Sequence, residues 1–260
     1  MEVFGLDQRQ FGAFLLVLVR TSGIFGFAPI FSNPRMPMQV RVGLCFFLAV
    51  LIAPLVDTES YQVGEKLLAY AIDVIGELLI GLAIGFVVAL IMTGVQLAGN
   101  LIDFQTGFGM ANVVDPLSSV QVTVMGQFKI LLATLVFVVV RGDHIIISAL
   151  VDSFRMVPLA SVGYSEGAAL QVFSTLSSVF ALAFRICAPV VAVLFLSTIG
   201  LGIVARTVPQ MNILIVGFPL KIGVGLVATM ASIPFIVAIV RRAFTGSGGD
   251  VRALLRFMGG

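Results

Sequence analysis

LLIGLAIGFVVALIMTGVQLAGNLI, residues 78–102, is an apolar run without a charged side chain. As an α-helix it would be about 37 Å long, because each residue adds about 1.5 Å, and this exceeds the roughly 30 Å hydrocarbon core of a bilayer. Residues 186–205 and 222–240 form two further uncharged apolar runs that are long enough to span. The sequence therefore predicts an all-α membrane protein.

Composition places the whole chain in the same class. Of its 260 residues, 59% are hydrophobic and 11% are charged, with a mean hydropathy of +1.14. Soluble domains contain about 25% charged residues, so this chain is expected to contact membrane lipid. The net charge of +2 is too small to indicate nucleic-acid binding, and no patch combines aromatic with basic residues.

The sequence carries no motif of an enzyme or of a cofactor site. It contains no Gly-x-Ser-x-Gly, no His-Glu-x-x-His, no P-loop and no Gly-x-Gly-x-x-Gly. The one histidine, His144, is interpreted as a solvated residue at a helix edge. Cys45 and Cys187 lie in apolar runs, where cysteine acts as a small core residue. We therefore expect no catalysis, no cofactor, no metal site and no disulfide.

Shorter and interrupted apolar runs complete the predicted architecture, at residues 11–31, 42–56 and 122–140. With residues 67–101 as one continuous rod, the pattern predicts about six long helices. Prolines inside apolar segments are expected to kink them, namely Pro189, Pro219 and Pro234. Turn signals separate the helices at residues 33–37, 115–116, 157–158 and 208–209.

No linker rich in Ser, Pro or charge divides the chain, so residues 1–260 are expected to form one integral-membrane domain. Within it we assign helical hairpins to residues 11–102 and 122–240, a connecting loop to 103–121 and a basic tail to 241–260. The N-terminus lacks the basic start and cleavage site of a secretory signal, so the first apolar segment is expected to be retained.

Four cations lie inside the apolar stretches: Arg20, Lys129, Arg185 and Lys221. A basic side chain near mid-bilayer costs at least about 2.5 to 3.5 kcal/mol if it faces lipid. These helices are therefore expected to pack against protein, with acidic groups, carbonyls or water as partners of the cations. That favours a subunit of a membrane assembly over a free-standing bundle.

The distribution of basic residues in the loops does not define a topology. Arg35 and Arg41 favour the cytoplasm for the first connection. Six spans would place the equally basic C-terminal tail on the opposite side. Either the number of spans is odd, or some helix pairs are hairpins that do not cross; the buried cations favour hairpins.

One helix stripe carries acidic and small residues every four positions: Asp73, Glu77, Gly81, Gly85 and Ala89. Small residues on one face allow a second helix to approach closely, while the carboxylates meet a cation. Tight helix packing is the favoured interpretation. A proton or ion relay through Asp73 and Glu77 is the alternative.

The segment 99–112, GNLIDFQTGFGMAN, alternates glycine with bulky apolar residues. Gly107 and Gly109 supply backbone freedom, and Phe104, Phe108 and Met110 can pack together and exclude water from a constriction. An interhelical connection that packs on its neighbours is equally compatible with the residues alone.

Residues 206–222, RTVPQMNILIVGFPLKI, resemble the signature of the flagellar biosynthetic protein FliR family, and injectisome relatives share a looser version. The resemblance extends from about residue 11 to 242. Two other regions agree with it: Arg20-Thr21-Ser22-Gly23 with Pro29, Pro37 and Arg41, and residues 99–116 with Gly107-Phe108-Gly109. Leu214 differs from the phenylalanine of many relatives. The form Val208-Pro209-Gln210-Met211-Asn212 favours the flagellar branch over the virulence branch.

The resemblance implies a subunit of the export gate of the flagellar type III secretion system, a hetero-oligomeric helical assembly. Its expected partners are the P and Q subunits and the B subunit, and its cargo is unfolded rod, hook and filament protein. In that family the hairpins rise out of the membrane plane inside the basal-body ring of the bacterial inner membrane. Export is driven by the proton motive force.

The resemblance also assigns roles to residues. Residues 103–112 match the segment that occupies the closed pore, so the expected seal comprises Phe104, Gly107, Phe108, Gly109 and Met110. The charged residues would then clamp helices or subunits together: Arg20, Asp73, Glu77, Lys129, Arg185, Arg206 and Lys221.

The competing hypothesis is a secondary transporter of a small solute, with Asp73 and Glu77 as the coupling site. That class is expected to show internal repeats and paired broken helices, and Pro189 with Pro219 is the one suggestive pair. An ion channel is a third option, without a carbonyl filter motif or acidic rings.

Overall fold

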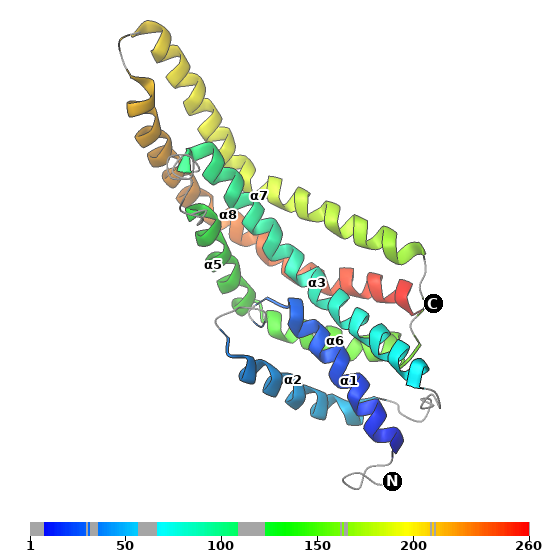
Figure 1. Ribbon diagram of the computed structural model, residues 1–260. Coiled ribbons are helices and arrows are strands. Elements are labelled where there is room, and N and C mark those ends of the chain that lie inside the picture. Colours follow the sequence, from blue (N-terminus) through cyan, green and yellow to red (C-terminus); the bar gives the residue numbers. More distant parts are fainter. Residues whose placement is uncertain are drawn as a thin grey trace. The chain divides into compact units, whose positions relative to one another are not determined.

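Seven α-helices and one short 3-10 helix account for nearly all of the chain that the computed structural model describes, which is residues 8–29, 31, 36–56, 67–108, 123–161, 163, 166–208, 210 and 212–259. They are α1 (Gln8–Phe27), α2 (Met38–Ile52), η1 (Ala53–Leu55), α3 (Leu67–Thr106), α5 (Val124–Val139), α6 (Gly142–Met156), α7 (Glu166–Thr207) and α8 (Ile213–Met258) (Figure 1). No strand occurs in these ranges, which confirms the predicted all-α class.

The apolar length of the helices agrees with a membrane protein. Five helices are long and apolar enough to span, and α5 with α6 supplies a sixth span if the pair is counted as one broken helix. The break between them falls at Arg141, whose backbone is left-handed with φ of 55°. The expected number of about six long helices is confirmed.

Prolines end some helices and lie inside others. Pro158 follows the end of α6 at Met156, as the turn signal predicted. By contrast, α7 continues through Pro189, and α8 continues through both Pro219 and Pro234. A single proline removes one backbone hydrogen bond, which a helix of more than forty residues tolerates.

Two sequence-based segment assignments were wrong at their boundaries. Helix α3 continues to Thr106, so residues 103–106 are helical and do not belong to the loop. No breaker precedes Gly107, which adopts a φ of 92° and donates its N–H to the carbonyl of Asp103, as a glycine does at a helix C-terminus. Helix α8 likewise continues to Met258, and the predicted basic tail is its last part.

The end of α8 is helical because one of its faces is apolar and buried. Phe244, Val251, Leu254 and Leu255 are each at most 2% exposed. Gly163 donates its N–H to the carbonyl of Met258 at 2.8 Å, which fixes the last turn of the helix to the connection that follows α6. The three glycines of this segment therefore do not interrupt the helix.

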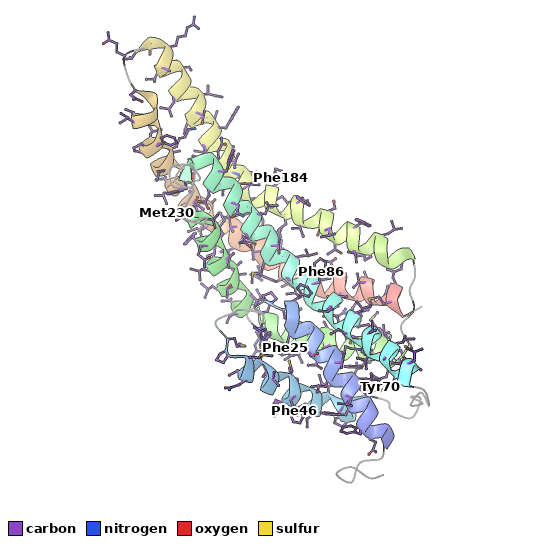
Figure 2. The ribbon with its side chains drawn as sticks, in the orientation of Figure 1. Phe25, Phe46, Tyr70, Phe86, Phe184 and Met230 are labelled. Atoms are coloured by element: carbon purple, nitrogen blue, oxygen red, sulfur yellow. The ribbon has the colours of Figure 1, made fainter. Side chains whose placement is uncertain are left out.

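The chain divides into two compact units. Unit 1 comprises Met1–Leu90, Val138–Ser177 and Phe244–Gly260, and unit 2 comprises Ile91–Phe137 and Ser178–Ala243. The prediction of a single domain stays a prediction. In unit 1, α1 packs against α2, where the rings of Phe14 and Phe46 meet edge to face at 5.8 Å (Figures 1 and 2).

Unit 2 contains an antiparallel hairpin formed by the C-terminal part of α7 and the N-terminal part of α8 (Figure 1). Its α7 half buries Ile186, Val190 and Leu194 completely. Gly225 of α8 is in ordinary van der Waals contact with Leu194 of α7, because an added Cβ would be 3.4 Å from that side chain. The close contact of Gly225 is with the end of α3, where the same Cβ would lie 2.5 Å from the methyl group of Thr106.

Candidate functional site

Helices α1 and α3 of unit 1 cross at three glycines. A Cβ added at Gly81 would overlap the carbonyl oxygen of Arg20, and one at Gly85 would lie 2.6 Å from the carbonyl oxygen of Ile24. On the α1 side, a Cβ at Gly23 would lie 2.8 Å from the carbonyl oxygen of Leu78. No larger residue fits at these positions unless the backbones separate.

The close crossing brings two opposite charges together. Arg20 of α1 donates from Nε to Oε2 of Glu77 on α3 at 2.5 Å, and both side chains are 0% exposed. A buried ion pair of this kind is stable only if its remaining polar atoms also find partners. The first predicted clamp thus joins two helices within this chain.

Those further partners come from α6 and the turn after it. Nη1 of Arg20 donates to the hydroxyl of Ser153 at 3.2 Å and to the carbonyl of Val157 at 3.1 Å. Oε1 of Glu77 accepts the backbone N–H of Ala160 at 3.1 Å. The ring of Phe154 lies 4.2 Å from the guanidinium carbon and adds a cation–π contact. We call Arg20, Glu77, Ser153, Phe154, Val157 and Ala160 the buried charge cluster.

The rest of the predicted stripe lies outside this cluster. Asp73 and Ala89 are each partly exposed. Both carboxylate oxygens of Glu77 accept hydrogen bonds, one from Arg20 and one from the backbone N–H of Ala160, and they hold α3 against α1 and the turn after α6. The geometry therefore favours tight packing over the relay hypothesis for this stripe.

A second carboxylate connects two helices in unit 2. Asp103, near the end of α3, is 4% exposed and accepts the backbone N–H of Met125 at 2.9 Å and that of Gly126 at 3.1 Å. These N–H groups belong to the first turn of α5, where a helix has no internal acceptor for them. Gly99 and Gly126 permit the approach, because a Cβ on Gly99 would overlap the Cα of Gly126.

Replacing Asp103 with alanine is expected to destabilise the protein by about 1 to 2 kcal/mol, because the first turn of α5 loses its capping acceptor. The readout is the urea midpoint of the purified chain in detergent. Asp143→Ala is the matched control, because it removes an exposed carboxylate within the first turn of α6, whereas Asp103 is buried and accepts hydrogen bonds from the first turn of α5. Equal midpoints for the two variants would contradict the capping role.

The start of the predicted pore-sealing segment is visible at the end of α3. Phe104 is 81% exposed, and Phe108 is partly buried. A Cβ at Gly107 would lie 2.8 Å from the ring of Phe218 on α8, so this glycine is required both by its positive φ and by the contact. Gly109 and Met110, the other members of the predicted seal, lie outside the described residues.

Lys129 of α5 is 0% exposed, as expected for a cation in an apolar helix that packs against protein. Among the described residues no hydrogen-bond acceptor lies within reach of its Nζ. Lys129 is therefore a buried cation without a hydrogen-bond partner in that part of the chain.

The other predicted clamp cations, Arg185, Arg206 and Lys221, form no ion pair with a carboxylate in the described part of the chain. Arg185 on α7 and Arg206 at the end of α7 are exposed. Lys221 of α8 is partly buried and lines a cavity of about 260 Å³ with apolar neighbours such as Leu201 and Phe218. Arg20 and Lys129 are buried within this chain and Arg185 is exposed in it, so the expectation that Arg185 packs against protein stays a prediction.

Several residues of these sites were not anticipated. Ser153 and Phe154 gave no sequence signal, because their role depends on where α6 packs. Gly23 could have been found from its position three residues after Arg20, and Asp103 from its place one turn after Gly99. No group of three or more metal-ligating residues occurs in the described ranges.

Fold and site together define an all-α integral membrane protein whose helices cross at glycines and are joined by buried charges. The sequence model of "Bacterial export proteins, family 1" matches residues 11–247, and the chain belongs to this family. It is 36% identical to the flagellar biosynthetic protein FliR of Bacillus subtilis over 253 residues, 96% of each chain. It is 29% identical to FliR of Escherichia coli (88% of this chain, 87% of the relative) and 28% identical to FliR of Aquifex aeolicus (92% and 93%).

Proposed function

We propose that this protein is a non-enzymatic subunit of the flagellar type III export gate and forms part of the pore through which unfolded flagellar proteins pass. The observation that carries the proposal is the alignment with a FliR protein over 96% of both chains. On this proposal the partners are the P, Q and B subunits, and the site of action is the inner membrane at the flagellar basal body.

The distribution of charges supports a subunit that is completed by others. The buried charge cluster pairs the charge of Arg20 with that of Glu77 inside unit 1, and Nη2 of Arg20 is the one guanidinium nitrogen without a hydrogen-bond partner among the described residues. In contrast, Arg185 and Arg206 present their charges on the surface of apolar helices. An uncompensated cation on such a surface is unfavourable in lipid and favourable against a partner that supplies an anion.

Mass measurement of the intact detergent-extracted complex tests the proposal. A gate subunit is expected to co-purify with several different small hydrophobic proteins. A secondary transporter would instead purify as a monomer or small homo-oligomer. Recovery of this chain alone, in a strain that assembles flagella, would contradict the proposal.

Lys221→Ala is expected to lower the yield of that complex at least threefold, because the cavity beside Lys221 would lose its one charged group. Co-purified partner protein, measured per mole of this chain, is the readout. Arg252→Ala is the control. Arg252 is also a cation of α8, but it already pairs with Asp152 at 3.3 Å on the surface, where such pairs contribute little. An unchanged yield for Lys221→Ala would contradict a role of Lys221 in assembly.

The pore-sealing role of the segment after α3 has its own test. Deleting residues 107–111 is expected to let small ions leak across the membrane, because an apolar seal excludes water only while its bulky residues fill the constriction. Conductance of cells that carry the assembled variant gate is measured. Conductance equal to that of the parent strain would contradict the sealing role.

A further inference from the structure

The C-terminal end of α3 contacts α8 at two places in unit 2. A Cβ added at Gly107 would lie 2.8 Å from the ring of Phe218, and one added at Gly225 would lie 2.5 Å from the methyl group of Thr106. Phe218 and Gly225 are seven residues apart, so they share one face of α8 and lie about 10 Å apart along its axis. This face of α8 therefore supports the point from which the chain leaves α3.

Phe218 alone makes the contact at Gly107. Apart from the chain neighbours of Gly107, no other described residue comes within 4 Å of the position that its Cβ would occupy. Gly107 adopts a φ of 92° and donates its N–H to the carbonyl of Asp103, so its backbone is fixed on the α3 side. The ring of Phe218 is the group that fixes it on the α8 side.

A cavity of about 260 Å³ lies beside the same ring, between α7 and α8. The residues that line it include Leu201, Gly202, Ala205, Phe218 and Lys221. An apolar cavity of about 150 Å³ is large enough to hold benzene, so this one has room for a phenyl ring. Leu201 supplies an apolar wall, and the aliphatic stem of Lys221, three residues after Phe218 on the same helix face, supplies another.

The ring of Phe218 thus has two apolar surroundings within reach of one bond rotation. Aromatic side chains in helices adopt two common χ1 rotamers, near 180° and near −60°. Either position would place an apolar ring against apolar groups, so the hydrophobic effect favours neither strongly. A small change in the neighbouring helices is therefore enough to move the ring from one position to the other.

We propose that Phe218 positions the base of the sealing segment, residues 107–111. With its ring on Gly107 it holds the segment closed, and with its ring in the cavity between α7 and α8 it releases the segment. The inference rests on the proposed function, since residues 107–111 form a seal only on that proposal. Gly107 acts as the hinge, because glycine changes its backbone angles at little steric cost once the ring has left. Phe218 is a positioning residue: it acts through Gly107 and touches no exported chain.

Shortening Phe218 tests the first position in cells that assemble the whole gate. Phe218→Ala is expected to raise the leak of small ions at least threefold, because nothing then holds Gly107 against α8. Phe218→Leu keeps an apolar contact and should add less than half of that extra leak. Co-purified partner protein and the membrane level of each variant should stay within twofold of the wild type. Phe235→Ala is the control, because Phe235 is a phenylalanine of α8 that is 50% exposed, and the leak should not change.

Filling the cavity tests the second position. Gly202→Leu would place a side chain in the cavity, and Gly200→Leu is its matched control. A Cβ at either glycine of α7 meets no atom within 4 Å, but of the two only Gly202 lines the cavity. Gly202→Leu is expected to lower the export rate of flagellar protein at least threefold without raising the leak, because the ring has no second position. Gly200→Leu should export at the wild-type rate.

The two kinds of variant are expected to fail in opposite ways, which a merely structural role would not produce. General destabilisation of unit 2 would lower export and complex yield in both. Phe218→Ala should instead lose the seal while the complex persists, and Gly202→Leu should keep the seal and lose export. Because Gly202→Leu leaves Phe218 in place, it decides the second position even if Phe218→Ala does not accumulate, and Phe218→Val then replaces Phe218→Ala in the leak measurement.

Three results would overturn the inference. Phe218→Ala could conduct like the parent strain while deletion of residues 107–111 leaks, which would remove Phe218 and leave the sealing role intact. Phe218→Leu could leak as much as Phe218→Ala, so that contact with Gly107 would not be the cause. Gly202→Leu could export as fast as Gly200→Leu, which would exclude the second position. If the deletion itself does not leak, the proposed sealing role fails first and the inference fails with it.

Discussion

Replacing Glu77 with alanine is expected to lower the free energy of unfolding by about 3 to 5 kcal/mol, because it leaves the buried guanidinium of Arg20 without a counter-charge. The same change removes the acceptor of the Ala160 N–H, so the turn after α6 also loses its hydrogen bond to α3. The readouts are the urea midpoint of the purified chain in detergent and its steady-state level in membranes.

Asp73→Ala is the matched control for this prediction. Asp73 lies one turn before Glu77 on the same helix and is partly exposed, so its removal should change the midpoint little. The double variant Arg20→Leu with Glu77→Leu should be more stable than Glu77→Ala, because no unpaired charge remains buried. If Glu77→Ala and Asp73→Ala unfold at the same urea concentration, the cluster does not stabilise unit 1.

Gly81→Leu is expected to cost about 3 kcal/mol or more, because the new side chain would occupy the space of the Arg20 carbonyl. The helices α1 and α3 would have to separate, and the separation would stretch the Arg20–Glu77 pair. Gly81→Ala is expected to destabilise the protein in the same way but by less, since its Cβ alone already overlaps that carbonyl.

Gly43→Ala supplies the control for the glycine crossing. Gly43 also lies in a helix of unit 1, but a Cβ added there meets no atom within 4 Å. Alanine is the better helix former by about 1 kcal/mol, so this variant should be as stable as the wild type or more so. Gly81→Ala and Gly43→Ala with equal urea midpoints would contradict the close crossing.

The candidate sites differ in how much of each could be predicted from the sequence. The four-residue spacing of Glu77, Gly81 and Gly85 predicted one helix face with a carboxylate above a small-residue contact, and that face does contact α1. Nothing in the spacing named Arg20 as the cation, because the pairing depends on which of several helices crosses α3. The cap by Asp103 was missed for a related reason: its acceptor role exists only once α5 begins beside the end of α3.

The class of this protein follows from local properties of the chain. Uncharged runs such as residues 78–102 must avoid water, and an α-helix satisfies every backbone group within itself, so helices of membrane length need no tertiary information. Which cations are compensated within the chain is a different kind of property. Arg20 and Arg185 both lie in apolar helices, yet one is enclosed by α3 and α6 and the other stands on an outer face. That distinction arises only when helices distant in sequence pack together, because electrostatic compensation depends on distance in space.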